Sequence, residues 1–518
     1  MNRSFFLRYW PYLTAFGLLS LWSMVQFPWH LSSSDAAFYL MNARELSQFQ
    51  VAESINSYWS PLWSWLMVPF FWIGLEGLWP MKILQFGIGL YGVALGLRVL
   101  DHLKLRPALI LVGGSLLLLS CWMMHLSHTP DLLMAILLLQ YFFWIWTKPL
   151  HPIKIGLLGA ALFWCKSFGF PFFIAHFLIW SVWYYWQDQD RKFALQSATT
   201  LFVFLCFSGC WMATMATKFG WVGLGTSGAY NMAYMGPIMN FQPPYFDHFI
   251  DPETDFTHYF IAEEQGLFGD YGQWSPFADA KGRAYYWGHL QNNFSKLYYI
   301  SFLRDGFFLL LFFLAGWWIR RIQVKSEWQA FLWQVFLFLG VYVGGYFLLF
   351  PNERYLWIAN LLVIPAILVF FAGFRQIRLI GGFQLICLGI LMGVNLLAFA
   401  EIRLKDHAFY GQYHLHESAI VQLDLAGKNV VSNRRPYERK LKDHMDIMSY
   451  LAYSQKLKVW GLFNTKTLEK EGLIRLLDLP IDYFFLWETA PHAERHFQRH
   501  SLVASFPEID LKIYRLNR

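Results

Sequence analysis

Long apolar segments recur along this chain, and they constrain its fold more than any other feature. About eleven of them come close to the ~20 residues that a helix needs to cross a bilayer. In hydrocarbon, only helices and closed barrels satisfy their own backbone hydrogen bonds, so such segments predict α-helices. Only 14% of the residues are charged, against about 25% in a soluble domain. We therefore expect a polytopic α-helical membrane protein. The expected spans are residues 9–29, 81–100, 107–124, 131–147, 153–168, 170–187, 193–215, 304–320, 328–350, 355–372 and 378–400.

The segment 59–75 is also apolar, and the charges of the connecting loops decide whether it crosses. If it does not cross, the Lys and Arg residues of the short loops gather on one side, as they do in cytoplasmic loops. If it crosses, every later basic loop moves to the outside. We therefore expect 59–75 to lie in, or dip into, the outer membrane interface. The tryptophans that suit such a position are Trp59, Trp63, Trp65 and Trp72.

This topology predicts a multi-pass protein of the inner or plasma membrane with a cytoplasmic N-terminus. The outer face receives the loops 30–80 and 216–303, together with everything after residue 400. Connections this long exceed what packing needs and are usually functional. Residues 283–303 look like an amphipathic helix that returns to the membrane. We expect residues 1–400 to form a transmembrane catalytic domain.

Beyond residue 400 the composition becomes polar, and short apolar strands alternate with helical patterns. Residues 401–518 are therefore expected to form a small periplasmic or extracellular α/β domain. This region lacks glycine-rich phosphate loops, so nothing argues for a nucleotide site. For the protein as a whole, no nucleic acid is expected as a partner. The expected strands are 429–432, 458–462, 482–487, 501–506 and 511–515, and the expected helices are 443–455, 466–478 and 491–499.

Four charged residues, far apart in sequence, fall at outer helix ends or outer loops in this topology: Asp35, Asp131, Lys166 and Arg354. Each has a simple structural explanation. Asp35 and Asp131 could cap helices. Lys166 could extend toward the interface and bind helix-terminal carbonyls, and Arg354 could pair with Glu353. These explanations give no reason for the four to gather on one side.

A shared ligand does give such a reason. Two cations can bind a phosphate, Arg354 through a bidentate fork and Lys166 as a point charge. A nearby carboxylate can take a proton from an attacking hydroxyl or amine, or can hold a metal ion. The phosphate of a lipid that enters from the bilayer would lie at this depth. We therefore interpret the four residues as parts of an active site at the outer membrane surface.

The order of short motifs along residues 1–400 resembles that of the GT-C glycosyltransferases, in particular the protein O-mannosyltransferases (glycosyltransferase family 39) and the lipid A aminoarabinose transferase. The motifs are Asp35…Tyr39…Ala43, Ser60-Pro-Leu62, Pro130-Asp131, Lys166 and Glu353-Arg-Tyr355. The resemblance implies an inverting glycosyltransferase that uses a polyprenyl-phosphate sugar donor at the outer face of the membrane. The acceptor could be a glycan, a lipid or a protein.

The same resemblance assigns roles to individual residues. Asp35 takes the position of the catalytic carboxylate. Asp131 is a second candidate catalytic residue on our own mechanistic hypothesis, in which it would orient the acceptor or Asp35. Lys166, Arg354 and Tyr355 would contact the donor phosphate. The remaining residues expected to bind substrate are Tyr39, Tyr298, Tyr299 and Glu353.

Two features distinguish this chain from many relatives. A second acid often follows the first, but here Ala36 follows Asp35, which favours a single base over a paired-acid metal site. Lys166 precedes Ser167-Phe168, where a pair that begins with glycine is common. We predict no metal-ligand set, although a divalent ion stays open as a cofactor. The histidines considered as ligands are His125, His128 and His289, and the five cysteines, all within apolar runs, lack CxxC spacing and are expected to be buried.

Two other functions stay open at this point. A ligase of the same architecture would transfer a preassembled lipid-linked oligosaccharide rather than one sugar. A non-catalytic lipid or glycan transporter, a flippase, would also combine apolar helices with charges at the membrane face. Transporters usually show two matching halves with charges near the midplane. Here the charges gather at one interface, which favours an enzyme.

Overall fold

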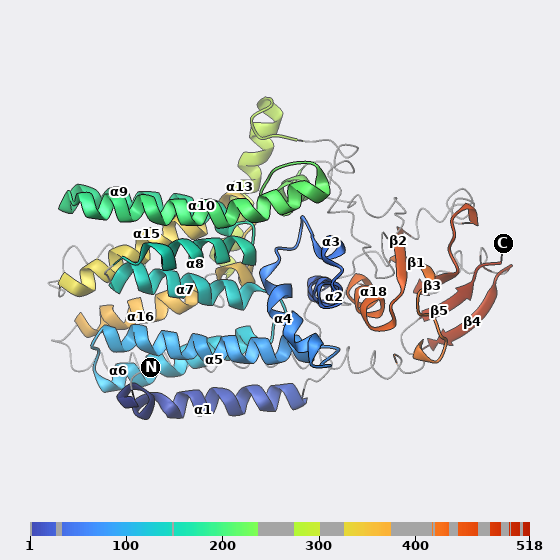
Figure 1. Cartoon of the computed structure of the whole chain (residues 1–518), viewed down its shortest axis with the longest axis horizontal. Helices are drawn as coiled ribbons and strands as arrows, with labels where there is room; N and C mark the ends of the chain where they lie inside the picture. Colours follow the sequence, from blue (N-terminus) through green and yellow to red (C-terminus); the bar gives the residue numbers. More distant parts are fainter. Residues whose placement is uncertain are drawn as a thin grey trace.

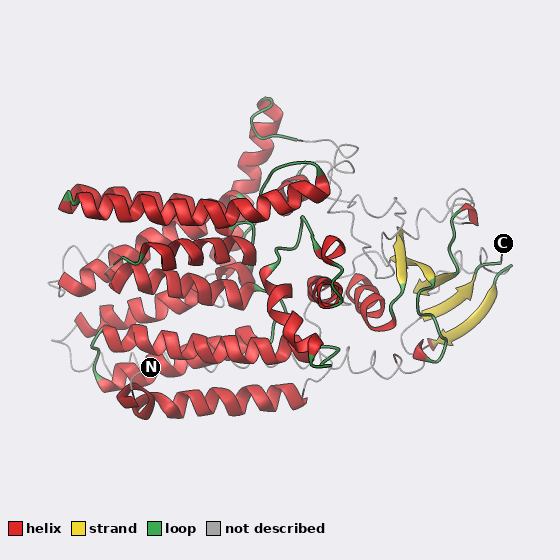
Figure 2. Ribbon diagram, viewed as in Figure 1, coloured by secondary structure: helices red, strands yellow, loops and turns green. Residues whose placement is uncertain are grey.

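The computed structural model is a bundle of roughly parallel and antiparallel helices, with a small α/β unit beyond one end (Figures 1 and 2). It describes residues 3–26, 34–147, 150–236, 274–300, 326–373, 417, 420–434, 444–464, 477–487, 497, 499–507 and 511–517. The bundle helices are α1 (Arg3–Gln26), α5 (Trp79–His102), α6 (Pro107–His125), α7 (Asp131–Thr147), α8 (Pro152–Cys165), α9 (Gly169–Asp188), α10 (Arg191–Phe219), α15 (Ser326–Leu348) and α16 (Trp357–Gly373).

The bundle helices follow the apolar segments of the sequence closely. Four of them, α5, α6, α10 and α15, are long and apolar enough to cross a membrane, and α7 and α8 are shorter apolar helices. Proline opens α6 and α8, where its missing N–H costs no helical hydrogen bond. Two of the expected spans, 304–320 and 378–400, lie outside the described residues.

Short helices lie where the bundle meets the C-terminal unit: α2 (Ser34–Ser47), α3 (Val51–Ser54) and α4 (Leu62–Trp72). The 11 residues of α4 span about 16 Å, too little to cross a ~30 Å hydrocarbon core. Trp72 is exposed, as an interfacial ring would be, but Trp59 and Trp63 are buried in protein. The interfacial assignment is wrong for those two rings because α4 packs on α2, with Ser64 Oγ donating to Tyr39 O at 2.9 Å.

At the opposite end of the bundle, many helix ends and loops carry Lys or Arg. Arg8 Nη1 and Asp101 Oδ1 lie 2.9 Å apart, and Trp328 Nε1 donates to Leu103 O at 3.1 Å. These contacts bring together the start of α1, the end of α5 and the start of α15. The basic residues of the helix ends and loops here include Arg98, Lys104, Arg106, Lys154, Arg191 and Lys192. The cytoplasmic side assigned to this end remains a prediction.

The C-terminal unit contains a five-stranded mixed sheet of order β2-β1-β3-β5-β4. β1 pairs in parallel with β2 and β3, whereas β5 runs antiparallel to β3 and β4. The parallel pair β1–β2 needs a crossover, and α18 lies between them in sequence. Each expected strand range coincides with a strand to within two residues. The bounds are β1 Asn429–Arg434, α18 His444–Gln455, β2 Lys458–Asn464, β3 Tyr483–Trp487, β4 Ser501–Phe506 and β5 Leu511–Arg515. Most of the expected helices 466–478 and 491–499 falls outside the described residues.

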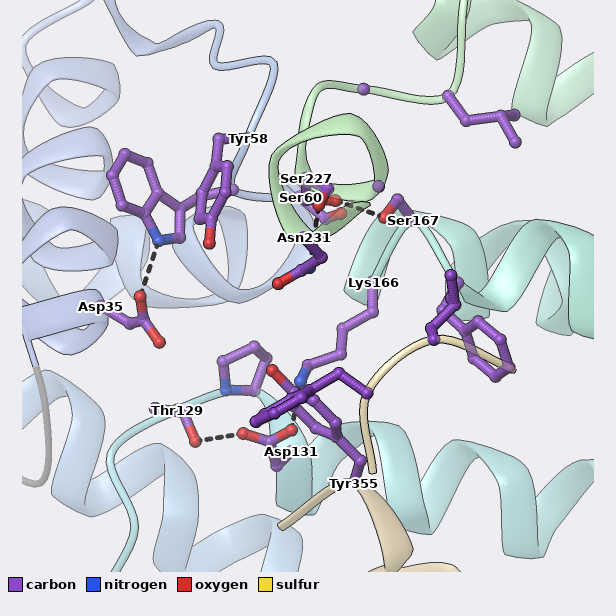
Figure 3. Close-up of a pocket in the computed structure, with 18 of the residues that line it drawn as sticks. Asp35, Tyr58, Ser60, Thr129, Asp131, Lys166, Ser167, Ser227, Asn231 and Tyr355 are labelled. Carbon is purple, nitrogen blue, oxygen red and sulfur yellow. Dashed lines mark hydrogen bonds and ion pairs between the residues drawn. The ribbon is translucent and has the colours of Figure 1, made fainter. Parts of the chain in front are cut away.

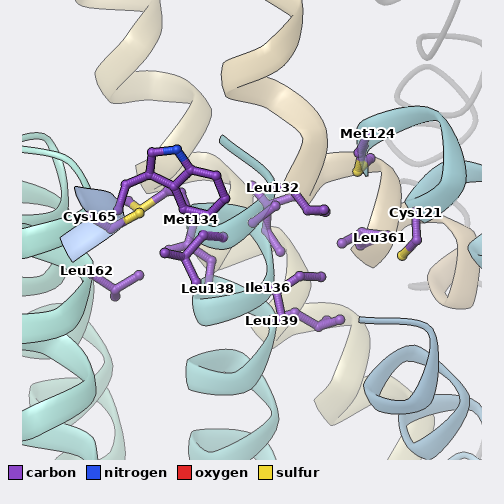
Figure 4. Close-up of a cluster of buried hydrophobic side chains, with 14 of the residues drawn as sticks. Cys121, Met124, Leu132, Met134, Ile136, Leu138, Leu139, Leu162, Cys165 and Leu361 are labelled. Carbon is purple, nitrogen blue, oxygen red and sulfur yellow. The ribbon is translucent and has the colours of Figure 1, made fainter. Parts of the chain in front are cut away.

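Aliphatic and sulfur-containing side chains fill the middle of the bundle around α7 (Figure 4). Cys121 and Cys165 are buried there as free thiols, as the sequence predicts. Cys206 and Cys210 are exposed on α10, so the prediction of buried thiols is wrong for them. Their face of α10 is apolar and exposed, which is the composition expected of a surface turned toward lipid.

One arginine fastens the C-terminal unit to the bundle end. Arg44, near the end of α2, donates from Nη1 to Tyr453 O at 2.8 Å, and its guanidinium lies 4.6 Å from the Tyr453 ring centroid. Tyr453 Oη in turn donates to Gly77 O at 3.3 Å. A helix that begins at Ser34 therefore ends in contact with α18.

Replacing Arg44 with Ala should loosen this junction. The variant loses a charge-assisted hydrogen bond and a cation–π contact, together worth about 2 kcal/mol in a partly buried setting. The measurement is the temperature at which a protease begins to cleave the C-terminal unit of the purified full-length protein. Arg8→Ala is the control, because it breaks an exposed ion pair worth about 0–1 kcal/mol. Equal temperatures for Arg44→Ala and wild type would refute the junction.

Candidate active site

A cavity of about 230 Å³ opens at the bundle end that faces the C-terminal unit. Helix ends and loops from distant parts of the chain form its wall. They are the start of α2, residues 58–60, residues 129–131, the α8–α9 turn, residues 224–231, and the segment from the end of α15 to the 3₁₀ helix η4 (Glu353–Leu356). Asp35, Asp131, Lys166 and Arg354 all line it, so the fold brings together the four charges chosen from the sequence. Figure 3 shows Asp35, Asp131 and Lys166 around the cavity.

These four residues, here called the ion cluster, form one continuous chain of charge. Lys166 Nζ contacts Asp131 Oδ1. Arg354 Nε lies 3.6 Å from Asp131 Oδ2, and Arg354 Nη2 lies 3.0 Å from Asp35 Oδ2. The snorkelling and local-pair explanations for Lys166 and Arg354 therefore do not describe their main contacts. Asp131 holds both cations at once.

The ion cluster contains two positive and two negative side chains, and three of the four are partly exposed. Side-chain exposure falls from 28% at Asp35 and 27% at Arg354 to 19% at Lys166 and 2% at Asp131. Burial by itself lowers the pKa of Arg354, but the carboxylates of Asp131 and Asp35 outweigh it and raise that pKa well above its usual range. Both cations carry more N–H donors than their carboxylate contacts use. A ligand in the cavity can therefore reach charged donors whose positions are already fixed.

Buried hydrogen bonds hold the Asp131 carboxylate in place. Thr129 Oγ1 donates to Asp131 Oδ2 at 2.5 Å. Gln85 Nε2, from α5, donates to Ser127 O at 2.5 Å and to Thr129 O at 2.9 Å. Cys165 Sγ lies 3.5 Å from Pro130 O. The loop before α7 is thus tied to α5 and α8. Asp131 is the first residue of α7, and its side chain makes two ion pairs.

Asp35 stands in the first turn of α2 and is held from a different side. Trp59 Nε1 donates to Asp35 Oδ1 at 3.3 Å, and the Trp59 ring stacks on Phe38 at 4.2 Å. Tyr39 lies one turn further along α2 and also lines the cavity. Burial, followed by the nearby carboxylates of Asp35 and Asp131, raises the pKa of Tyr39 well above its usual range. Its hydroxyl therefore stays protonated and can act as a donor.

An aromatic stack forms the floor beneath Lys166. Lys166 Nζ lies 4.1 Å from the Tyr355 ring centroid, and Tyr355 stacks on Tyr346 at 4.9 Å. Tyr346 in turn lies 4.1 Å from Phe168. The ring contact supports the ammonium electrostatically without using its N–H donors. Phe168 belongs to the Ser167-Phe168 pair that sets this chain apart from many relatives, and here it extends the stack.

Gly169 explains how Lys166 reaches this position. α8 ends at Cys165 because Lys166 is extended, and α9 begins only four residues later. A Cβ atom at Gly169 would lie 2.3 Å from Leu162 O, so the tight turn between the two helices requires glycine. The turn directs Lys166 into the cavity.

Comparisons with known proteins bear on this arrangement. No family model matches the chain, and no curated protein sequence matches it. Among solved structures, the chain is similar to the crystal structure of ArnT from Cupriavidus metallidurans in the apo state. The match has a TM-score of 0.50 and 10% sequence identity, and it covers 97% of this chain and 96% of that one. ArnT is an aminoarabinose transferase of the GT-C fold.

The chain has the GT-C fold. This confirms the fold implied by the order of the short motifs. At 10% identity the likeness concerns the fold alone, so the chemistry must be argued from the cavity itself.

One wall of the cavity was not predicted from the sequence. It comes from residues 224–231, which precede and begin α11 (Ser227–Tyr234). Thr226 N donates to Ser57 O at 2.8 Å, and Ser167 Oγ lies 2.7 Å from Ser227 Oγ. The sequence does contain one sign of this wall, which is the close spacing of Gly223, Gly225 and Gly228. This spacing also occurs in nucleotide-binding loops, but here it follows the helix α10 rather than a strand.

The other residues chosen from the sequence either lie outside the cavity or are not described. Glu353 is half-buried in η4 and does not line the cavity. Tyr298 and Tyr299 belong to α13 (Ala280–Ile300), but their side chains lie outside the described part of the structure. His125 and His128 are buried, and His289 Nε2 lies 2.8 Å from Leu349 O. Within the described residues, His, Cys, Asp and Glu form no group of three that could hold a metal ion.

Gly225 should be intolerant of a side chain. Its φ of +110° suits glycine, and a Cβ atom would lie 2.5 Å from Ser57 O. Gly225→Ala should therefore lower the free energy of unfolding by about 1–3 kcal/mol. Thermal unfolding of the purified protein would measure this.

Gly228 provides the matched control. It lies three residues away in α11, and a Cβ atom there would meet nothing within 4 Å. Gly228→Ala should be neutral or should stabilise the protein by about 0.5–1 kcal/mol, because alanine favours a helix. Equal unfolding temperatures for the two variants would show that residues 225 and 57 do not pack as described.

Proposed function

We propose that this protein is an inverting glycosyltransferase that moves a sugar from a polyprenyl-phosphate donor to an acceptor at the outer membrane surface. The observation that carries the proposal is the ion cluster. It places two fixed cations and two carboxylates around one cavity, at the end of a membrane-type bundle with the GT-C fold. The acceptor, a glycan, a lipid or a protein, would approach from the side of the C-terminal unit.

Lys166 and Arg354 would act on the leaving group. As the bond between the anomeric carbon and the phosphate oxygen breaks, the electron pair and a growing negative charge stay on the phosphate. Donors that already point at this charge lower the barrier, because they need no rearrangement during the step. Asp131 fixes the positions of these donors, since its buried carboxylate contacts both Lys166 and Arg354.

Asp35 would act on the acceptor. It is the more exposed of the two carboxylates, and its partner Arg354 is also a proposed phosphate ligand. A donor phosphate that binds Arg354 would compete with Asp35 for the same guanidinium. Asp35 could then accept the proton of the attacking hydroxyl or amine as the new bond to the anomeric carbon forms. Donor binding would in this way prepare the base.

The cavity size bears on the choice between a single sugar and a long glycan. Its volume of about 230 Å³ is below the ~300–1,000 Å³ typical of pockets for drug-sized ligands. This favours a single sugar with its phosphate over a preassembled oligosaccharide. Against a flippase, the four charges lie at helix ends and loops around one cavity at one end of the bundle rather than along the middle of its helices.

Asp35→Asn should abolish transfer while the protein remains folded. Loss of the base should lower kcat by about 100-fold or more, because general-base catalysis commonly contributes 10²–10⁴-fold. Arg354→Ala should weaken the binding of polyprenyl-phosphate sugars and of sugar-free polyprenyl phosphate alike. The assay is transfer and binding with a panel of such donors and the purified protein.

Glu353→Gln serves as the control, because Glu353 neighbours Arg354 in sequence but does not line the cavity. Its transfer rate should stay within a few-fold of wild type. Normal turnover by Asp35→Asn would refute the proposed base. Unchanged donor binding by Arg354→Ala would refute the proposed phosphate site.

Thr129→Val should reduce transfer without removing any charge. Valine has nearly the shape of threonine but cannot donate to Asp131 Oδ2, so the carboxylate would hold Lys166 and Arg354 less firmly. We expect roughly a tenfold loss of kcat, since one buried charge-assisted hydrogen bond is worth about 1.5–3 kcal/mol. Thr129→Ser keeps the hydroxyl and should retain most of the activity. Equal rates for the Val and Ser variants would show that this hydrogen bond has no role in catalysis.

A further inference from the structure

The charges in the cavity are confined to the ion cluster. Among the described residues that line the cavity, the ionised side chains are the four of the cluster, and each is paired with another. The wall across from Asp131 carries hydroxyl and amide groups (Figure 3). The residues that contribute them, here called the polar wall, are Ser60, Ser167, Ser227 and Asn231.

Hydrogen bonds fix Ser167, Ser227 and Asn231 of the polar wall before any ligand arrives. Ser167 Oγ and Ser227 Oγ lie 2.7 Å apart and join the α8–α9 turn to α11. Asn231 Nδ2 donates to Ser227 O at 2.8 Å, which sets the orientation of the amide. In Figure 3 the amide oxygen of Asn231 extends into the cavity, toward the space between Asp35 and Lys166. It is an acceptor directed at whatever occupies that space.

A cationic ligand group would be poorly placed against this wall. Asp131 is engaged by both Lys166 and Arg354. Asp35 pairs with Arg354 before the donor binds. In the proposed mechanism Asp35 is then needed as the base for the acceptor, so it does not serve as a counter-ion for the sugar. The first residues of α11, Ser227 and Gly228, line the cavity, and the start of a helix carries partial positive charge. An ammonium here would lose hydration without gaining a counter-ion, which is costly. A sugar hydroxyl could instead exchange hydrogen bonds with serine and asparagine at little cost.

We propose that the polar wall is the sugar subsite and that it selects a neutral, hydroxyl-bearing sugar over an amino sugar. This inference rests on the proposed function, because the ion cluster must hold the donor phosphate for the sugar to meet the wall. Asn231 is the specificity-determining residue, since its amide oxygen accepts a sugar hydroxyl and offers no charge to an ammonium. An aspartate at that position would keep the acceptor and add the missing charge.

The test compares pairs of polyprenyl-phosphate hexoses that differ in one group. In each pair one ring hydroxyl, at C2, C3 or C4, is replaced by an amino group that is protonated at pH 7. Sugar-free polyprenyl phosphate is the third probe. Binding is measured with the full-length protein in nanodiscs, for wild type, Asn231→Asp and Asn292→Asp. Asn292 lies on the exposed face of α13, away from the cavity, and controls for the added charge.

Wild type and Asn292→Asp should bind the neutral member of every pair about tenfold or more tightly than the amino member. In Asn231→Asp, the affinity for the neutral donor divided by the affinity for the amino donor should fall by about tenfold for at least one ring position. The affinity of this variant for sugar-free polyprenyl phosphate should stay within a few-fold of wild type, because the phosphate meets Lys166 and Arg354.

The outcomes separate this inference from the function beneath it. If wild type binds amino and neutral donors equally, or if Asn231→Asp leaves the ratio unchanged, the sugar subsite is refuted while the phosphate site stands. If wild type binds neither the sugar donors nor sugar-free polyprenyl phosphate, the proposed function fails and the inference falls with it.

Discussion

Asp131 carries a full negative charge with 2% of its side chain exposed, and the site is organised around the cost of placing that charge there. The buried charge is stabilised by ion pairs with Lys166 and Arg354 and by a hydrogen bond from the Thr129 hydroxyl. In return, the two cations are held apart from each other and fixed at the cavity edge. An isolated lysine and arginine at a membrane surface would instead extend into water, where phosphate binding would have to order them.

The second organising element is α2, which contacts both the site and the C-terminal unit. Asp35 lies in its first turn, and Arg44 lies in its last. Between them, residues 36–43 are buried against neighbouring elements, so the helix has little freedom to rotate. A shift of α18 against Arg44 would therefore be felt at Asp35. Through α2, the C-terminal unit can therefore influence the position of Asp35, even though none of its described residues lines the cavity.

Much of this arrangement could be predicted from the sequence, because hydrophobicity and charge act over short stretches. Apolar runs located the bundle helices, and the same-side placement of four charges located the cavity. The pairing within the ion cluster could not be predicted: Arg354 and Asp35 are 319 residues apart, and only the packed bundle makes them neighbours. Trp59 and Trp63 were misplaced because an apolar ring suits both an interface and a protein core. The polar wall was missed because serine and asparagine carry no charge pattern, although the glycines beside them marked an unusual backbone.

The contact between Gly225 and Ser57 joins two loops of the cavity wall that are far apart in sequence. Thr226 N and Oγ1 both meet Ser57, and Lys218 Nζ donates to Ile55 O at 3.0 Å. Residues 55–60 and 224–231 are therefore joined at Ser57, and neither can lift away alone without breaking both hydrogen bonds of Thr226. A widening of the cavity that keeps these two hydrogen bonds would turn both segments together about their attachments. On the α10 side the attachment is Gly220, whose left-handed backbone (φ +72°) ends the helix and leaves room for a change of direction.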